Sequence, residues 1–371
     1  MYRGEQDEQP YVLPCVVEAE KRVIAQPPNK EYSGYGGSAA FCRLAAELAL
    51  GPSNAALADG SAVSVQALSG TGALRLGCEF LSRYYSPSNV VLLSSPTWVN
   101  HPHIIARCPG LEARPYRYYE PSTRSLDYEG MIQDLEAAPE AAILVLHACG
   151  HNPTGVDVSR EQWAGLLAVA QRKRFLVLWD VAYQGFVRDL EADVEGLRLF
   201  AASSLEMLVA QSFSKNMGLY GERVGCLTLV TDDAAAAKGA LDLLHDAARS
   251  MYISPPIHGG SIATAILGDP ELRAQWEREL QAMADAMAAR RHALHAALVE
   301  VGAPGCWDHI AAQRGMFSFT GLTRAQCQHL TNKYHIYLSP DGRISLGGLP
   351  VAKCKYVAEA IKDAVESCPA S

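Results

Sequence analysis

The sequence predicts an α/β protein, with a large domain built on a mostly parallel, doubly wound sheet and a smaller α+β domain. Short apolar runs alternate with longer amphipathic stretches through the middle of the chain, which is typical of parallel strands joined by helices. Residues 269–301 are rich in Ala, Glu and Arg and contain no glycine. This stretch predicts one helix of about eight turns, long enough to bridge two domains.

Each element follows from local composition. Ser159 is expected to cap a helix that runs to Arg172. Four apolar runs predict buried strands, namely 90–95, 142–147, 175–180 and 206–210. After the long helix, 315–320 and 335–338 predict strands of the smaller domain. We expect residues 10–282 to form the large domain, and residues 1–9 with 283–371 to form the small one.

Composition excludes several classes of function. The chain has 371 residues, of which 49% are hydrophobic and 19% charged, which predicts a soluble globular protein. A net charge of −8 argues against nucleic acid as a partner, and no apolar run is long enough to span a membrane. The acidic N-terminus resembles neither a signal peptide nor an Arg-rich transit peptide, so we expect a cytoplasmic protein, with mitochondria as the alternative. Ten scattered cysteines without a CxxC pair predict reduced thiols and no metal site.

Lys215 is the most informative residue. It follows an apolar run, lies among small and hydroxyl residues, and precedes Arg223 by eight positions. A lysine in this setting can form a Schiff base with a carbonyl cofactor, whereas Ser212 and Arg223 suit a phosphate group. A carbonyl and a phosphate together indicate pyridoxal phosphate. The alternative is an ordinary solvated lysine, so other residues must supply the partners of such a cofactor.

Polar residues at the predicted carboxyl ends of the strands supply such partners. Gly70 and Thr71 open a predicted helix whose N-terminus suits an anion, although a flexible loop is the alternative. Asp180 ends a strand and suits a protonated pyridine nitrogen, or else a structural ion pair. Tyr183 and Asn152 are placed to donate hydrogen bonds to a ring hydroxyl, although the Asn152 segment also reads as a simple turn.

Three further side chains complete the candidate set. Trp98 suits an aromatic plate on the cofactor, or plain core packing. His101 is expected to orient Asp180. Arg343 suits a bidentate clamp on a substrate carboxylate, with a solvated surface arginine as the alternative.

Several segments together resemble the aspartate aminotransferases of the class-I pyridoxal-phosphate family, over essentially the whole chain. They include LSGTGALR, SSPTWVNH, LHACGHNPTG, QSFSKNMGLYGERVG and HIYLSPDGRISLGGL. The resemblance implies a fold-type I homodimer with active sites at the subunit interface. It also implies ping-pong transfer of an amino group from L-aspartate to 2-oxoglutarate, giving oxaloacetate and L-glutamate.

The resemblance further implies a role for each candidate. Lys215 would be the Schiff-base lysine and proton shuttle, and Asp180 would hold the pyridine nitrogen. Asn152 and Tyr183 would hold the ring hydroxyl, and Trp98 would stack on the ring face. The phosphate would be held by Gly70, Thr71, Ser212 and Arg223, with Tyr32 reaching it from the other subunit. The substrate would be held by Arg343 with Trp98 and Asn152.

Two departures from the family bear on function. By the resemblance, Met1 aligns after the N-terminal arm that embraces the partner subunit, so we expect this chain to lack the arm, and the stability of the dimer is left open. The resemblance also places Ser261 where an arginine would pair the side-chain carboxylate of a dicarboxylate substrate. Losing one partner of a desolvated ion pair costs about 2–5 kcal/mol, which favours a broad-specificity or aromatic aminotransferase as an alternative. A weakened, non-enzymatic paralogue is a third possibility, against which the joint retention of Lys215, Asp180 and Arg343 argues.

Overall fold

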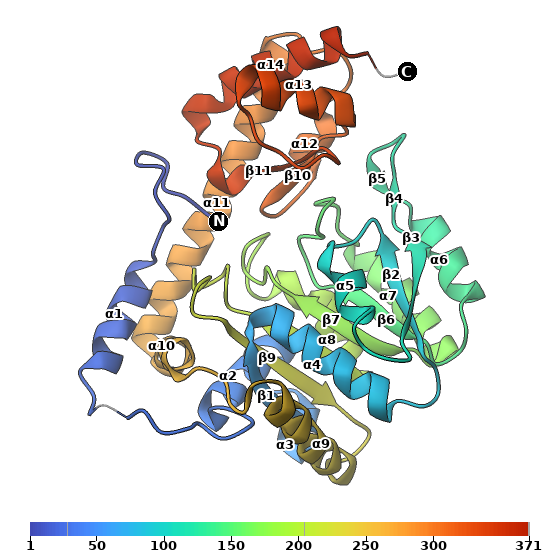
Figure 1. Cartoon of the computed structure of the whole chain (residues 1–371), viewed down its shortest axis with the longest axis vertical. Coiled ribbons are helices and arrows are strands. Elements are labelled where there is room, and N and C mark those ends of the chain that lie inside the picture. The colour runs from blue at the N-terminus through green and yellow to red at the C-terminus, as the bar shows by residue number, and fades with distance from the viewer. Residues whose placement is uncertain (28, 204, 370–371) are drawn as a thin grey trace.

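The computed structural model describes residues 1–27, 29–203 and 205–369. A larger and a smaller part are joined by helix α11 (Pro270–Glu300), which runs from one to the other in Figure 1. The larger part is built on a seven-stranded sheet with strand order β1-β9-β8-β7-β6-β2-β3. These strands are β1 (Ala62–Leu68), β2 (Val90–Ser95), β3 (Glu112–Arg117), β6 (Ile143–His147), β7 (Leu176–Val181), β8 (Met207–Ser212) and β9 (Val224–Val230).

The sheet is mostly parallel, as predicted. Strands β3, β2, β6, β7 and β8 pair in parallel, and β9 runs against both of its neighbours. The four predicted strands correspond to β2, β6, β7 and β8. All residues of β7 and β8 are buried, which explains why these segments are continuously apolar.

Helices cover both faces of the sheet, so the sheet is doubly wound. Residues of α4, α5 and α9 pack on one face, and residues of α2, α3, α6, α7 and α8 pack on the other. The helices of this part, with two that lie against α11, are α1 (Pro14–Ile24), α2 (Ala39–Leu50), α3 (Ala55–Asp59), α4 (Ser69–Tyr84), α5 (Asn100–Ile105), α6 (Tyr128–Ala137), α7 (Arg160–Lys173), α8 (Glu195–Ala201), α9 (Ala234–Tyr252) and α10 (Ile257–Gly268).

Two predicted helices have the expected limits. The hydroxyl of Ser159 accepts the N–H of Gln162, and the Gln162 side chain bonds back to Ser159, which forms a capping box at the start of α7. The predicted bridging helix is α11, whose N-cap Asp269 accepts two N–H groups of the first turn. The predicted domain boundary at residue 282 falls inside α11 and stays a prediction.

The smaller part contains a two-stranded sheet, β10 (Phe317–Phe319) with β11 (Arg343–Ser345), and a short hairpin, β4 (Tyr119–Glu120) with β5 (Ser125–Leu126), lies near it in Figure 1. Its helices are α12 (Asp308–Ala312), α13 (Arg324–Tyr334) and α14 (Cys354–Ser367). Strand β10 lies within the predicted 315–320.

The predicted strand at 335–338 is wrong, because this segment has no regular structure. His335 adopts a φ of 54° at the end of α13, and the side chain of Tyr337 is 78% exposed. The partner of β10 is β11, a few residues later. Among the described residues, every helix is too short or too polar to cross a membrane.

Candidate active site

A cavity of about 300 Å³ lies at the carboxyl ends of β6 and β7 and the N-terminus of α4. It is lined by ten of the predicted site residues: Gly70, Thr71, Trp98, Asn152, Asp180, Tyr183, Ser212, Lys215, Arg223 and Arg343. Two predicted residues do not line it: His101, which contacts Asp180 instead, and Tyr32, whose side chain is 77% exposed. The role of Tyr32 in another subunit stays a prediction.

Lys215 follows the end of β8 and points into the cavity. Its Nζ lies 5.1 Å from the centroid of the Tyr183 ring. Burial lowers the pKa of Lys215 below the ordinary lysine value, Asp180 opposes this shift, and Arg223 adds to it. The amine is therefore neutral more often than a surface lysine, as a proton-accepting group requires.

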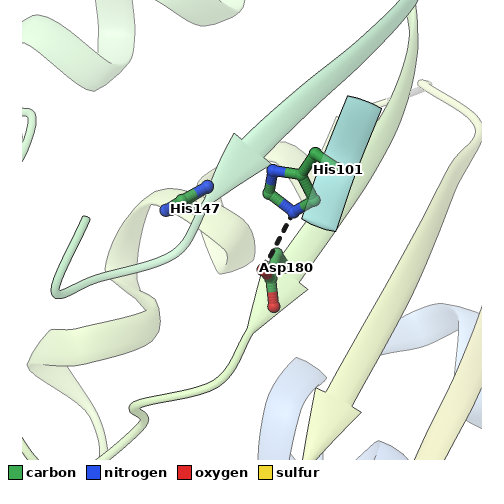
Figure 2. A group of neighbouring side chains, drawn as sticks. All are labelled: His101, His147 and Asp180. Atoms are coloured by element: carbon green, nitrogen blue, oxygen red, sulfur yellow. Dashed lines mark hydrogen bonds and ion pairs between the residues drawn. The ribbon is translucent and has the colours of Figure 1, made fainter. Parts of the chain in front are cut away.

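Asp180 is buried in β7 and is oriented by His101, as predicted. Figure 2 shows the contact, in which Nε2 of His101 lies 3.1 Å from Oδ2 of Asp180. Nδ1 of His101 lies 2.8 Å from the hydroxyl of Thr97. Burial by itself raises the pKa of Asp180, but the hydrogen bond from His101 and the neighbouring His101, His147 and Lys215 side chains outweigh it, and the pKa is lowered. The carboxylate therefore stays charged.

His147 lies beside this pair in Figure 2, and the donor atoms of His101, His147 and Asp180 all lie within 4.8 Å of one another. Burial, with the neighbouring His151 and His101, holds the pKa of His147 well below its usual range. Its Nδ1 accepts the N–H of Asn152 at 3.2 Å, whereas its buried Nε2 has no partner in the part of the chain that the structure describes. An unpaired buried nitrogen beside a charged carboxylate suits a polar ring in the cavity.

Three hydroxyls meet where α4 begins. The hydroxyl of Ser69 lies 3.1 Å from that of Ser212 and 2.8 Å from that of Ser214. A β-carbon at Gly70 would lie 3.0 Å from Cβ of Ser212, so glycine allows the start of α4 to approach the end of β8 closely. Arg223 lines the same cavity. Hydroxyls, free N–H groups at a helix start and a guanidinium together suit a phosphate.

Arg343 reaches the cavity from β11 in the smaller part. Its Nη1 donates to Oδ1 of Asn152 at 2.8 Å, and its Nη2 donates to the hydroxyl of Ser339 at 3.3 Å. Its guanidinium lies 4.6 Å from the centroid of the Phe317 ring. No carboxylate pairs with Arg343 among the described residues. The fixed guanidinium is therefore available for a carboxylate of a ligand.

Comparison with known proteins is consistent with this site. A family model described as aminotransferase class I and II matches residues 2–361. The chain belongs to this family. The mitochondrial aspartate aminotransferase P2 of Lupinus angustifolius is 46% identical over 366 residues, which are 98% of this chain and 80% of the relative. The cytoplasmic aspartate aminotransferase of Dictyostelium discoideum is 46% identical over 367 residues, 99% of this chain and 83% of the relative.

A solved structure extends the likeness to the fold. The aromatic-amino-acid aminotransferase from Burkholderia pseudomallei, covalently bound to pyridoxal phosphate, matches with a TM-score of 0.94 and 40% identity. The match covers 98% of this chain and 90% of the other. The present aminotransferase therefore shares its fold with enzymes that are named for different amino acids.

Sequence reasoning missed several residues that line the aminotransferase cavity, including Ser69, His147, Cys149, Ser214, Tyr220 and Phe317. Ser69 and Ser214 lie inside motifs that the sequence singled out, yet nothing in the sequence shows that their hydroxyls meet. Tyr220 also fixes the start of the chain, since its hydroxyl accepts the N–H of Tyr2 at 3.2 Å.

Proposed function

We propose that this aminotransferase binds pyridoxal phosphate in the cavity and transfers the amino group of L-aspartate to 2-oxoglutarate in a ping-pong reaction. The observation that carries the proposal is that Lys215, Asp180 and Arg343 line one cavity together with the hydroxyls at the start of α4, which suit a phosphate. Relatives named aspartate aminotransferases support the choice of substrate. When bound, the cofactor supplies an electron sink for the substrate α-carbon.

The chain's own residues would divide the work as follows. Asp180, kept charged by His101, holds a proton on the pyridine nitrogen. The neutral amine of Lys215 carries a proton between the substrate α-carbon and the carbonyl carbon of the cofactor. Arg343 binds the α-carboxylate of the substrate, and its bond to Asn152 fixes that carboxylate against the ring.

We also propose a homodimer in which each subunit completes the site of the other. Tyr32, Tyr35 and Arg249 are exposed, and the guanidinium of Arg249 lies 5.4 Å from the centroid of the Tyr35 ring. Ser261 is partly exposed on α10, and its hydroxyl donates to the carbonyl of Ile257 in its own helix. We assign to Arg249, instead of position 261, the cation that binds the second carboxylate of a dicarboxylate substrate in the partner's site.

The second candidate is an aromatic or broad-specificity aminotransferase, which Ser261 and the Burkholderia structure favour. A cofactor absorbance titration separates the two. Purified protein loaded with pyridoxal phosphate receives aspartate, glutamate or phenylalanine, with Lys215→Ala as the control. Bleaching of the cofactor band by aspartate and glutamate at low concentration supports the first proposal. Bleaching by phenylalanine alone favours the second, and a protein that binds no cofactor contradicts both.

A further inference from the structure

A second cavity, of about 320 Å³, lies between the larger part and α12, apart from the lysine. Four arginines line it: Arg124 from the β4–β5 hairpin, Arg160 at the start of α7, Arg188 after β7, and Arg314 after α12. We call this cavity the arginine groove. None of the four arginines has a part in the proposed transamination.

The arginine groove carries more positive charge than its carboxylates neutralise. Arg188 pairs with Glu195 at 2.9 Å. In the described ranges, Arg124 donates to two uncharged groups, the carbonyl of Cys306 and Nδ1 of His309. Within residues 1–27, 29–203 and 205–369, the exposed guanidinium groups of Arg160 and Arg314 have neither a hydrogen-bond nor a carboxylate partner.

The one further carboxylate in the groove is already engaged. Asp157 accepts the N–H groups of Gly150 and His151, each at 2.8 Å. Its oxygens are therefore committed to the backbone, and no arginine lies within ion-pair distance of them among the described residues. Arg160 and Arg314 thus have no ion-paired carboxylate among the described residues, although the charge of Arg314 lowers the pKa of Asp157, which burial raises, and the charge of Arg160 lowers the pKa of Glu161.

Arg160 occupies a position that does not help its own helix. It is the first residue of α7, a helix of 14 residues whose N-terminus carries a partial positive charge. The capping box of Ser159 and Gln162 already closes the start of the helix. A cation placed at this end disfavours the isolated helix and favours a bound anion.

The arginine groove spans the junction of the two parts of the molecule. Arg314 follows α12 of the smaller part, and its N–H donates to the carbonyl of Gly155 of the larger part at 2.7 Å. Arg124 reaches across the same junction to Cys306. An anion that contacts Arg160 and Arg314 together therefore touches both parts.

We propose that the arginine groove binds a phosphate dianion, either free or as the terminal phosphate of a small metabolite, and that the bound phosphate ties the two parts together. The guanidinium fork matches phosphate oxygens in a bidentate manner. A volume of about 320 Å³ suits one small ligand.

Calorimetric titration of the pyridoxal-phosphate-loaded protein tests the proposal. Inorganic phosphate and glycerol 3-phosphate are titrated separately, with ionic strength held constant by sodium chloride. The variants are Arg160→Gln and Arg314→Gln. The matched control is Arg172→Gln, which removes the same charge from the far end of α7, where Arg172 pairs with Glu136. We expect each groove variant to weaken binding by about ten- to one-hundredfold, and the control to leave it unchanged.

The outcomes are separable. Binding of both ligands shows that free phosphate is sufficient. Binding of glycerol 3-phosphate alone indicates a phosphorylated metabolite. Either result supports the proposal if Arg160→Gln and Arg314→Gln weaken the binding. Absence of binding in the millimolar range overturns the proposal. So do equal losses in Arg172→Gln, which indicate ionic screening, and binding that is unchanged in both groove variants. The cofactor absorbance, recorded throughout, shows whether phosphate enters the first cavity instead. Circular dichroism melting verifies that each variant is folded.

Discussion

The pKa of Lys215 is lowered by burial and adjusted by two neighbours of opposite charge. Burial lowers it most, Asp180 raises it and Arg223 lowers it further. We predict that Asp180→Asn lowers this pKa further and that Arg223→Gln raises it. Only the neutral amine reacts with trinitrobenzenesulfonate, so the pH profile of labelling in cofactor-free protein moves to lower pH in the first variant and to higher pH in the second. Background labelling is subtracted with Lys215→Ala, and a shift of both variants in one direction would refute the assignment.

Gly70 is predicted to strengthen cofactor binding by leaving room beside Ser212. A β-carbon there would lie 3.0 Å from Cβ of Ser212 and would narrow the proposed phosphate corner. We expect Gly70→Ala to weaken pyridoxal phosphate binding about tenfold, which corresponds to ~1.4 kcal/mol. Equilibrium dialysis measures the affinity. Gly221→Ala is the control, because a β-carbon at Gly221 meets no atom within 4 Å. Equal affinities in the two variants would contradict the prediction.

For single residues, the sequence predicted which side chains carry the chemistry better than it predicted which side chains contact one another. A lysine after a strand and a carboxylate at the end of another strand are local patterns. The contact of Ser69 with Ser212 joins residues 143 positions apart, and only the folded sheet brings them together. The bond between Arg343 and Asn152, 191 positions apart, was inaccessible for the same reason.

Helix α9 contains a glycine that weakens it. Gly239 lies inside α9 and is exposed, and a β-carbon added there would meet no atom within 4 Å. We predict that Gly239→Ala raises the free energy of unfolding by about 0.5–1 kcal/mol, because alanine restricts the unfolded chain. Urea unfolding of the cofactor-loaded protein measures it. Gly60→Ala is the counterpart: Gly60 has a φ of +81°, so alanine there should destabilise. A loss of stability in Gly239→Ala would disprove the account.

Elements with strong periodicity or continuous burial were predicted well. Strands β7 and β8 are buried on both faces, and α11 contains no internal glycine or proline, so both kinds of element leave a clear signal. The error at 335–338 has a physical cause. The apolar side chains of this segment satisfy a strand pattern, but the backbone leaves α13 through a left-handed His335, and pairing with β10 begins only at Arg343.

The stability of the whole molecule is increased by a buried arginine that joins α11 to the smaller part. Arg291 donates to the carbonyls of Ile310, Gly315 and Phe317 at 3.1, 2.8 and 2.9 Å. We predict that Arg291→Met lowers the free energy of unfolding by about 3 kcal/mol or more, because three carbonyls lose their donor. Urea unfolding provides the value. Arg278→Met, exposed on the same helix, should change it little, and similar losses in both variants would contradict the prediction.

The assembly predicted for the molecule makes substrate choice depend on an exposed residue. If Arg249 binds the second carboxylate in the partner's site, Arg249→Gln lowers kcat/KM for aspartate by about thirtyfold or more and leaves phenylalanine nearly unchanged. Steady-state kinetics with both donors measures the ratio. Arg107→Gln, another exposed arginine, is the control. Equal losses of kcat/KM for aspartate and phenylalanine would show that Arg249 does not bind the side-chain carboxylate of the substrate.

Helix α11 also has a mechanical consequence. The indole of Trp276 donates to the carbonyl of Asn216, the residue after Lys215, at 2.7 Å, whereas Arg291 grips the smaller part about 22 Å further along the axis. Helix α11 is thus held at one end beside Lys215 and at the other end in the smaller part. A tilt of about 5° displaces the Arg291 end by roughly 2 Å and leaves Lys215 almost stationary. We expect such a tilt to move Arg343, which belongs to the smaller part, relative to the cavity while Lys215 keeps its place.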